Sequence, residues 1–549
     1  MRASSQPTLR DVRLTTRGAV ALPNHTFGPW TRAGVSVVKN NRLLIAAACL
    51  ISTCLVLVAT WHGVGLSPDS LQYLAATKSA LAGQGFTTIG WDGVRTPLTH
   101  YPPGYPMLLS AGAWLGMSLE SAARFSNVAL FAATLVLIAL IVRRIAPQPP
   151  WAAPIAVFAA AFTHDLVVAH SMAWSEPLYL TLTLGGFLAL AMAIDRRSLP
   201  LLIAAAVAAA VSSIVRYVGV ANIAVVGLVT LLWWRSGRWM RIGTPLLLSL
   251  FMVLPLLTTI LLGAQGGGGG GVANRRFVWH PLDMMDVRIA ASVVGKWMTP
   301  LDDAGFLSVA WLVALAALLG MLLVLRTRQA TPSDLPREGK TLTLILSLYA
   351  LVYMAVVALS MTVVDAQTTF EPRMLVPVLV VAIVVSITWL ARQSRRGIFV
   401  RLAGAGIIAL VLSANALRWL PWLRDAQRYG LALRRVDSEG LAIVDSARHF
   451  PRTAQVYSND PYYLRVHTQH VAAGLPRAMD PNSLLPNAHH SEQVQEICET
   501  AETRPTFVVL FDDPMSGDST ARADAAMRSG IVTRLAAGSI VRVRAGCKL

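Results

Sequence analysis

Charged residues are scarce in this sequence. Asp, Glu, Lys and Arg together make up 14% of the 549 residues, whereas a soluble globular domain usually carries about 25%. Apolar residues account for 54% of the chain, and the mean hydropathy is +0.54. A soluble core does not need this much apolar sequence. The composition therefore excludes an ordinary soluble protein and predicts a polytopic membrane protein.

Cysteine is also rare, with four in the chain. They form no CxxC pair and no Cys/His spacing typical of a metal site. Cys49 and Cys54 stand five residues apart in one apolar run and would face different sides of a helix, so they cannot bridge within it. Cys498 and Cys547 lie in the polar C-terminal region. They are candidates for a disulfide if that region faces an oxidising compartment.

Acidic residues are outnumbered by basic ones, 29 against 47, which gives a net charge of +18. Such an excess can indicate a nucleic-acid partner. Here, however, the basic residues come in short clusters between apolar runs, as the positive-inside rule requires of cytoplasmic loops, and no nucleic-acid partner is predicted. Residues 1–42 are polar and basic, and they are too long and irregular for the start of a signal peptide. We expect them to form a disordered cytoplasmic tail.

Apolar runs long enough to cross a bilayer recur along the rest of the chain. The sequence predicts about eleven spans, which makes residues 43–419 an α-helical polytopic membrane domain. The predicted spans lie near 43–61, 121–142, 151–169, 176–194, 199–215, 218–234, 243–263, 304–325, 341–360, 374–391 and 397–417.

The orientation of these spans follows from the basic clusters. Clusters occur at 143–144, 196–197, 235–241, 326–340 and 392–396, in every second loop. These loops and the N-terminus are therefore predicted to be cytoplasmic, in the inner or plasma membrane of the cell. The external parts would then be the loops 62–120, 264–303 and 361–373, and everything from about residue 420 onward.

The external parts have recognisable local patterns. "DSLQYLAATKSALAGQGF" has apolar residues at helical spacing and closes with Gly83 and Gly85, which predicts an amphipathic helix on the membrane surface. Its apolar side would carry Leu71, Leu74, Ala75 and Leu81. "YPPGYPMLLSAGAWLGM" predicts a second short helix in the interface, and the six glycines at 266–271 predict a flexible tether. Residues 420–549 predict a small α/β domain, with strands in "TAQVYSND" and "TFVVLFDD" and helices at 436–449, 488–502 and 520–529.

Three acids of these external parts could carry chemistry. Asp69, just beyond the first span, is a candidate general base, although an Asp in "SPDS" is also a common helix N-cap. Asp165 and Glu176 lie with His164 and His170 in the outer turn between two spans. Catalysis and ordinary capping or solvation are both open for this second pair.

Several external arginines could contact a phosphate. Arg216 lies midway through about 36 apolar residues and marks an external turn, either as an anchor that snorkels to the interface or as a bidentate phosphate contact. "NRRFVWHP" carries Arg275 and Arg276. "DAQTTFEPRMLVP" places Asp365, Glu371 and Arg373 at the mouth of a late span. External arginines at such places suit a lipid phosphate head group, and an ordinary interfacial ion pair is the alternative.

Four stretches occur in order along the chain: "PDSLQYLAATKSALAGQGF" after a single first span, "HYPPGYPMLL" followed by "AARFSNVAL", "SEPLYL" at the head of the fourth span, and "EPRMLVP" at a late span. This order resembles the GT-C superfamily of membrane glycosyltransferases. Within it, the chain is similar to the bacterial branch related to protein O-mannosyltransferases and lipid A aminoarabinose transferases, which is glycosyltransferase family 39-like. The resemblance covers residues 43 to 475.

The resemblance implies a GT-C-like fold and an enzyme that transfers a sugar from a polyprenyl-phosphate donor to an external glycan, lipid or protein acceptor, with inversion at the anomeric carbon. Asp69 would be the general base, assisted by Asp165 or Glu176. The residues expected to bind the donor phosphate are Arg216, Arg275, Arg276 and Arg373. The residues expected to line the substrate pocket are Tyr73, His100, Tyr101, Tyr105 and Asp365.

Two points remain open at the level of sequence. The cofactor that the resemblance allows is a divalent cation. Many members of the family carry two adjacent acids in the first loop, whereas here Ser70 follows Asp69, so a strong metal site is not implied. Two other functions also remain: a polymerase or ligase of lipid-linked glycans, which would not require Asp69, and a transporter. A transporter would be expected to show internal repeats and polar residues at mid-membrane, which the sequence does not clearly show.

Overall fold

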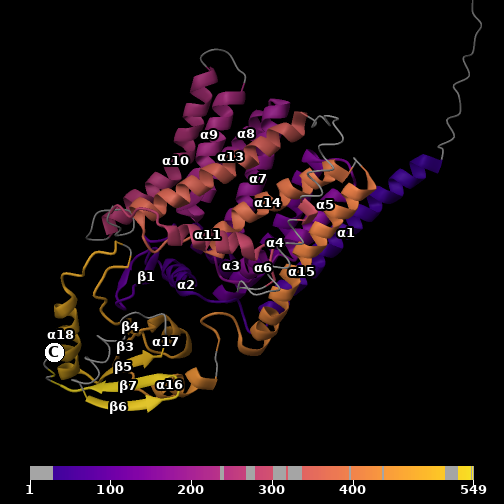
Figure 1. Ribbon diagram of the computed structural model, residues 1–549. Helices are drawn as coiled ribbons and strands as arrows, with labels where there is room; N and C mark the ends of the chain where they lie inside the picture. The colour runs from indigo at the N-terminus through magenta and orange to yellow at the C-terminus, as the bar shows by residue number, and fades with distance from the viewer. Residues whose placement is uncertain are drawn as a thin grey trace, which may run out of the picture.

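Long apolar helices form most of the part of the chain that the computed structural model describes (Figure 1). That part comprises residues 29–234, 240–266, 278–300, 317–319, 337–394, 397–435, 438–481, 483–512, 530–545 and 547. The helices of the bundle are α1 (Pro29–Ala59), α4 (Leu119–Ile145), α5 (Ala152–Ala161), α6 (His164–Ser171), α7 (Glu176–Arg196), α8 (Leu199–Val215), α9 (Val220–Trp233), α10 (Met240–Gly266), α13 (Arg337–Leu359), α14 (Pro372–Gln393) and α15 (Ile398–Tyr429).

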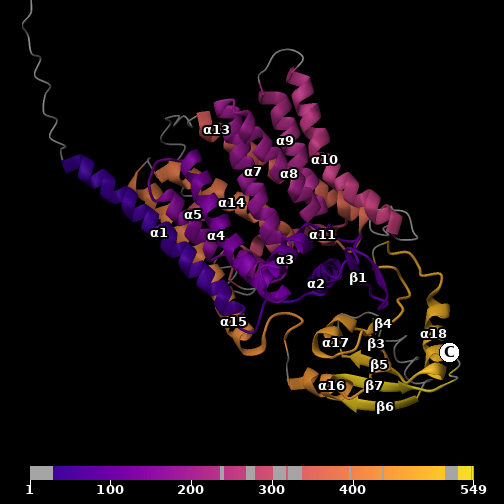
Figure 2. The ribbon, with the colours of Figure 1, turned by 180° about the vertical axis from the view of Figure 1, so that it is seen from behind.

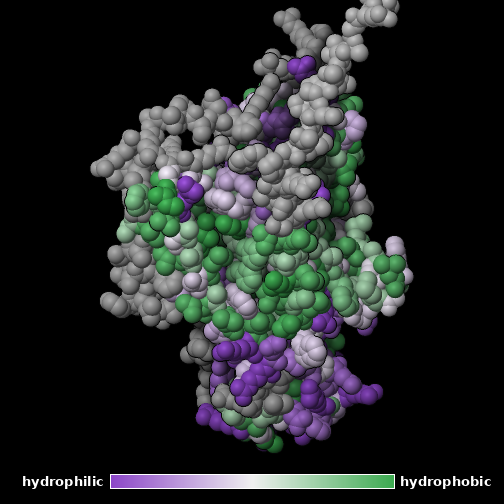
Figure 3. Space-filling view, turned by 90° about the vertical axis from the view of Figure 1, so that its right-hand side faces the viewer, coloured by the Kyte–Doolittle hydropathy of each residue, from purple (hydrophilic) through white to green (hydrophobic). Residues whose placement is uncertain are grey.

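Ten of the eleven predicted spans coincide with these helices, and the predicted span near 304–325 lies outside the described residues apart from 317–319. Seven of the described helices are long and apolar enough to cross a membrane, and the bent pair α5–α6 would make an eighth. The predicted polytopic membrane fold is therefore confirmed. Figure 3 shows the consequence on one face of the surface: an apolar band crosses the bundle, above a hydrophilic domain.

The third predicted span, 151–169, is broken rather than continuous. Helices α5 and α6 meet at a bend of 59°, and Thr163 between them has an extended backbone. The side chain of Asn415 in α15 accepts a hydrogen bond at 3.0 Å from the backbone N–H of His164, a donor left free where α6 begins. The segment predicted as a tight external turn therefore contains a second, buried helix.

Two helices are longer than the sequence suggested. Helix α1 begins at Pro29, within the predicted tail, and proline is favourable at a first helical position. Helix α15 continues past the predicted end at 417 and past Pro421 to Tyr429, so the expected domain boundary near 420 falls inside a helix. It ends at Gly430, whose φ of 84° is a left-handed conformation that glycine adopts without steric cost. Residues 1–28 lie outside the described part.

The loop 62–120, which the sequence predicts to be the first external loop, contains both predicted helices, α2 (Pro68–Leu81) and α3 (Gly104–Trp114), with a hairpin of β1 (Thr87–Ile89) and β2 (Arg95–Pro97) between them. The predicted apolar side of α2 is not its buried side. Ser70, Tyr73, Ala76 and Thr77 are buried instead, because the Tyr73 ring packs against other tyrosines of this loop. Leu81 is 41% exposed.

The second external loop holds a helix that the sequence analysis missed, α11 (Met284–Lys296). A capping box starts it: the Asp283 side chain accepts from the backbone N–H of Asp286, and the Asp286 side chain accepts from that of Asp283. The D-x-x-D spacing was the available signal. Apart from Gly266, the last residue of α10, the predicted polyglycine tether and the arginines after it fall outside the described residues.

The C-terminal domain is built on a five-stranded sheet in the order β4-β3-β5-β7-β6. Strands β4, β3 and β5 are parallel, while β7 and β6 run antiparallel to their neighbours. Both predicted strands, both described predicted helices and the Cys498–Cys547 disulfide are confirmed; the predicted helix at 520–529 is outside the described residues. The elements are α16 (Ser438–Arg448), β3 (Gln455–Ser458), α17 (Pro461–His467), β4 (Ala473–Gly474), α18 (His490–Thr503), β5 (Thr506–Phe511), β6 (Gly530–Leu535) and β7 (Gly538–Val543).

The C-terminal domain is fastened to the first external loop. The Trp91 indole N–H donates to the Leu475 carbonyl at 2.9 Å, and the Gly474 N–H donates to the Trp91 carbonyl at 2.6 Å. A side chain at Gly474 would collide with the Trp91 ring. Arg465 adds a hydrogen bond of 2.7 Å to the Gly90 carbonyl. Figure 2 shows α2, α3 and β1 lying between the bundle and the C-terminal domain, so both parts flank the first loop.

Candidate active site

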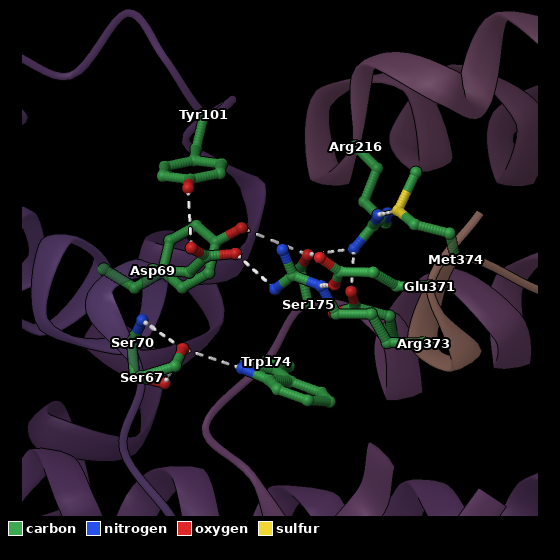
Figure 4. Close-up of polar contacts among 12 residues, drawn as sticks. Ser67, Asp69, Ser70, Tyr101, Trp174, Ser175, Arg216, Glu371, Arg373 and Met374 are labelled. Carbon is green, nitrogen blue, oxygen red and sulfur yellow. Dashed lines mark hydrogen bonds and ion pairs between the residues drawn. The ribbon is translucent and has the colours of Figure 1, made fainter. Parts of the chain in front are cut away.

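Asp69 lies in the first turn of α2, but it is not the residue that caps the helix. Ser67 is the N-cap, and its hydroxyl accepts a hydrogen bond from the Ser70 N–H at 3.3 Å. The same hydroxyl oxygen accepts from the Trp174 indole N–H at 2.8 Å (Figure 4). The capping interpretation of Asp69 is therefore wrong, and the carboxylate faces other partners.

Both oxygens of the Asp69 carboxylate are engaged. The Tyr101 hydroxyl donates to Oδ1 at 2.7 Å, and Nη1 of Arg373 donates to Oδ2 at 2.6 Å (Figure 4). The Asp69 side chain is 17% exposed. Arg373 comes from the first turn of α14, 304 positions later in the chain. A short loop helix and the mouth of a late membrane helix thus meet in one ion pair.

Opposing influences act on the pKa of Asp69. Burial raises it, but the Arg373 guanidinium and the hydrogen bond from Tyr101 lower it more, and the net pKa lies below the ordinary value. Burial, followed by the negative charge of Asp69, raises the pKa of the Tyr101 hydroxyl well above its usual value. At neutral pH Asp69 is therefore a carboxylate and Tyr101 a hydrogen-bond donor, and Asp69 is a weak base while Arg373 holds it.

A second buried ion pair lies beside the first. Glu176, the first residue of α7, pairs with Arg216 in the turn after α8, and their side chains are 6% and 15% exposed. Arg216 also donates to the Ser175 hydroxyl at 3.3 Å and lies 3.1 Å from the Met374 sulfur (Figure 4). The chain turns at Arg216 as predicted, and the Arg216 side chain points into this cluster.

The two pairs are connected through neighbouring residues. Arg373 and Met374 are consecutive, and each contacts one pair. Ser175, which accepts from Arg216, also forms a hydrogen bond of 3.2 Å with the Tyr73 hydroxyl. We call Asp69, Arg373, Glu176 and Arg216, with Tyr101, the Asp69 cluster.

Arg373 has more than one partner. Its Nε donates to Glu371 at 3.1 Å, which is the interfacial ion pair offered as the alternative from the sequence. Its guanidinium also lies over the Trp174 ring, 5.3 Å from the centroid. At 27% exposed, it is the more accessible of the two clustered arginines.

Aromatic rings pack behind Asp69. The Tyr73 ring lies 5.1 Å from the rings of both Tyr101 and Tyr105, and the His100 ring lies 4.5 Å from that of Tyr101. Four of the five residues expected in the substrate pocket are thus brought together. Tyr105 is fully buried, so it supports the others from the core.

The C-terminal domain also reaches this region, which the sequence did not indicate. Tyr462 of α17 is hydrogen-bonded to Gln72 of α2. Burial raises the pKa of Tyr462, and the negative charge of Asp69 contributes in the same direction. The C-terminal domain is therefore close enough to Asp69 for the two to interact electrostatically.

Asp165 does not join the cluster. Its carboxylate contacts His164 at 2.9 Å, the Trp297 indole N–H at 3.2 Å and Arg418 at 3.5 Å. These partners tie α6 to α11 and α15. The structure therefore places Asp165 in a buried connection between helices, and of the two acids predicted to assist Asp69, only Glu176 lies in the cluster.

The remaining predicted site residues fall elsewhere. Asp365 follows the π-helical turn η3 (Ser360–Val364), and its carboxylate accepts from the Gln367 backbone N–H at 3.0 Å and the Thr368 hydroxyl at 3.3 Å, which shapes its own loop. Arg275 and Arg276 lie outside the described residues. Within the described ranges, no three His, Cys, Asp or Glu side chains gather in a way that could hold a metal ion, and the divalent cation stays a prediction.

Comparison by sequence finds no protein-family model and no curated protein that match this chain. Comparison by structure does find relatives. Arabinofuranosyltransferase AftD from Mycobacteria aligns with a TM-score of 0.50 and 14% identity, over 92% of this chain and 42% of AftD. ArnT from Cupriavidus metallidurans aligns with a TM-score of 0.47 and 15% identity, over 92% of this chain and 98% of ArnT. The oligosaccharyltransferase of Archaeoglobus fulgidus aligns with a TM-score of 0.48 and 11% identity, over 85% of this chain and 68% of that enzyme. The likeness to AftD shows that the chain has the GT-C fold, as its motifs predicted.

Proposed function

We propose that this protein is a membrane glycosyltransferase that transfers a sugar from a polyprenyl-phosphate donor to an acceptor on the extracytoplasmic side. One observation carries the proposal: a carboxylate and two arginines from distant parts of the chain converge where apolar helices begin. The GT-C fold, shared with an arabinofuranosyltransferase, supports it. The basic loops, which the sequence predicts to be cytoplasmic, support an extracytoplasmic location for the Asp69 cluster and the C-terminal domain.

The chemistry of such a transfer needs both signs of charge. The acceptor hydroxyl oxygen would form a bond to the anomeric carbon while the bond from that carbon to the phosphate oxygen breaks, with inversion. The electron pair of the broken bond stays on the phosphate, where Arg373 and Arg216 would stabilise it. The hydroxyl proton passes to Asp69 as general base.

Because of the Asp69–Arg373 ion pair, the donor would have to bind before Asp69 can act as a base. Without donor, Arg373 keeps Asp69 ionised but weakly basic. A donor phosphate would compete for the same guanidinium. Once Arg373 turns toward the phosphate, burial acts on Asp69 with less opposition, and the pKa of the carboxyl rises toward the range where it accepts a proton. Donor binding would therefore activate the base.

The direct test is an assay of the purified, full-length protein with a panel of polyprenyl-phosphate sugars, measuring release of free polyprenyl phosphate. Asp69→Asn should lower the rate by about 10²–10⁴-fold while the protein remains folded, because it removes the base and keeps the side-chain volume. Asp445→Asn, an exposed acid on α16, is the matched control and should remain active.

The same pair of variants separates this proposal from its rivals. A folded Asp69→Asn variant with full activity would remove the base role and favour a polymerase or ligase of lipid-linked glycans. Flux across proteoliposomes with no release of polyprenyl phosphate from any donor would favour a transporter instead.

A further inference from the structure

A cavity lies at the end of the bundle opposite the Asp69 cluster. Helix α7 connects the two places, since Glu176 begins it in the cluster and Asp195 lies near its other end. A helix of 21 residues is about 30 Å long, close to the thickness of the hydrocarbon core of a bilayer. The cavity has a volume of about 320 Å³ and lies between the ends of α7 and α9 and the start of α13.

The polar side of this cavity is basic in character. Arg197 and Lys340 line it, and both are exposed. Asp195 also lines it, but its carboxylate already accepts from Arg144 at 2.5 Å and from the Thr341 hydroxyl at 3.3 Å. Among the described residues of the lining, the acid Asp195 is therefore paired within the protein, and a ligand would meet the side chains of Arg197 and Lys340 at the rim.

The position of Arg197 is also unusual. It follows the last turn of α7 with a φ of 52°, a left-handed conformation that helix ends normally give to glycine. An arginine there carries a backbone cost of about 1–2 kcal/mol. The helix end alone does not account for an arginine at this position, whereas binding of an anion by the guanidinium would.

The other side of the cavity is apolar and open to the lipid. Trp233 and Trp234 form part of its wall, and tryptophan rings favour the level of the lipid head groups. Leu344 and Trp233 are 47% and 40% exposed on the outer surface of the bundle, so the apolar wall continues onto the surface that faces acyl chains. A ligand that fits must combine an anionic head with an apolar tail.

We propose that this cavity binds the head group of an anionic phospholipid from the cytoplasmic leaflet. The phosphodiester would lie between Arg197 and Lys340, and the first part of an acyl chain would lie against Trp233 and Leu344. Basic pockets between membrane helices on the cytoplasmic side are suited to such head groups. The volume is at the lower end of the range of small-molecule sites, which fits a phosphoglycerol group. This inference does not depend on the proposed transferase activity.

The test compares lipid binding by the full-length protein in nanodiscs of phosphatidylcholine with and without phosphatidylglycerol, using native mass spectrometry and the midpoint of thermal unfolding. The double variant Arg197→Gln/Lys340→Gln removes the two cations of the rim. It should bind phosphatidylglycerol about tenfold more weakly or worse, because each charged hydrogen bond is lost. Its midpoint should no longer respond to that lipid.

The matched control is Arg143→Gln/Arg196→Gln, which removes two exposed arginines of the same end of the bundle that do not line the cavity. It should bind phosphatidylglycerol as the unmodified protein does. An equal loss in the control would show diffuse attraction and overturn the site. Equal stabilisation by soluble glycerol 3-phosphate would show a free phosphate ligand and overturn the lipid assignment, and so would an absence of preference over phosphatidylcholine. Trp233→Leu is a second variant, and it should weaken binding without changing charge.

Discussion

Arg373 holds Asp69 in its ionised form, so replacing it by glutamine should change how the proposed transfer depends on pH. Glutamine keeps a hydrogen-bond donor near the carboxylate but removes the positive charge. Burial, the largest influence on the pKa of Asp69, would then be opposed mainly by the hydrogen bond from Tyr101. The pKa of Asp69 should therefore rise from its depressed value.

The sign of the effect on the pH profile follows directly. A general base works only when it is unprotonated, so the rate falls as the pH drops through its pKa. In the unmodified protein the depressed pKa keeps this fall at low pH. In Arg373→Gln the fall should occur at a higher pH than in the unmodified protein. The donor complex will moderate the difference, because Arg373 is then shared with the phosphate, so kcat/KM, which reports the free enzyme, is the quantity to compare.

The size of the rate loss can be set from the contact that is removed. Nη1 of Arg373 lies 2.6 Å from the carboxylate and would make an equivalent bond to the donor phosphate. Hydrogen bonds to charged groups contribute about 1.5–3 kcal/mol. Loss of that amount in the transition state lowers kcat/KM by about 10–150-fold at a pH where Asp69 is ionised in both proteins.

The assay is the initial rate of polyprenyl-phosphate release across a pH series, with Arg424→Gln, an exposed arginine near the end of α15, as the control for charge. Arg424→Gln should match the unmodified protein in rate and profile. If Arg373→Gln loses rate but its acid limb coincides with that of the unmodified protein, then Arg373 acts on the phosphate alone. The coupling between the base and the phosphate site would then be refuted.

Four further outcomes are expected. Ser67→Ala should lower the free energy of unfolding by about 1 kcal/mol through loss of the α2 N-cap, measured by thermal unfolding. Cys498→Ser should destabilise the C-terminal domain by about 4 kcal/mol, because its disulfide closes a loop of 49 residues, measured by denaturant unfolding or limited proteolysis. Gly474→Ala should loosen the C-terminal domain from the first loop, because a methyl group collides with Trp91, and should increase proteolysis between the two parts. The unmodified protein should be more stable than Asp69→Asn, by an amount that is full above the unfolded-state pKa of Asp69. This difference in stability should shrink as the pH falls through the lower pKa of Asp69 in the folded protein, and it is measured as the difference in unfolding midpoint.

The membrane helices could be predicted from the sequence because their cause is local: a run of apolar residues of sufficient length defines each one. The break between α5 and α6 has no such cause. It depends on Asn415, which satisfies the backbone of His164 from 251 positions away. The end of α15 was misplaced because the span was predicted from the apolar run, which ends near residue 417, whereas the helix continues to Gly430.

The sequence indicated most residues of the site, but it did not indicate which acid contacts which arginine. Asp165 and Glu176 are eleven positions apart, lie in the same loop and look equivalent in the sequence. The fold separates them, since Glu176 starts α7 beside Arg216, whereas Asp165 contacts Trp297, which directly follows α11 in another loop. These partners come from distant parts of the chain, so the spacing of the two acids in the sequence does not reveal which of them joins the cluster.

The two clustered arginines differ in how firmly they are held, and this difference decides which of them can respond to a substrate. Arg216 is 15% exposed and is surrounded by Glu176, the Ser175 hydroxyl and the Met374 sulfur, so moving it would break a buried ion pair. Removing one partner of such a pair costs about 3–5 kcal/mol. Arg373 is 27% exposed, and it can give up Asp69 while it keeps Glu371 and the Trp174 ring. Arg216 is therefore suited to fixing the position of a donor phosphate. Arg373 is suited to leaving the Asp69 carboxylate and contacting that phosphate when the donor binds.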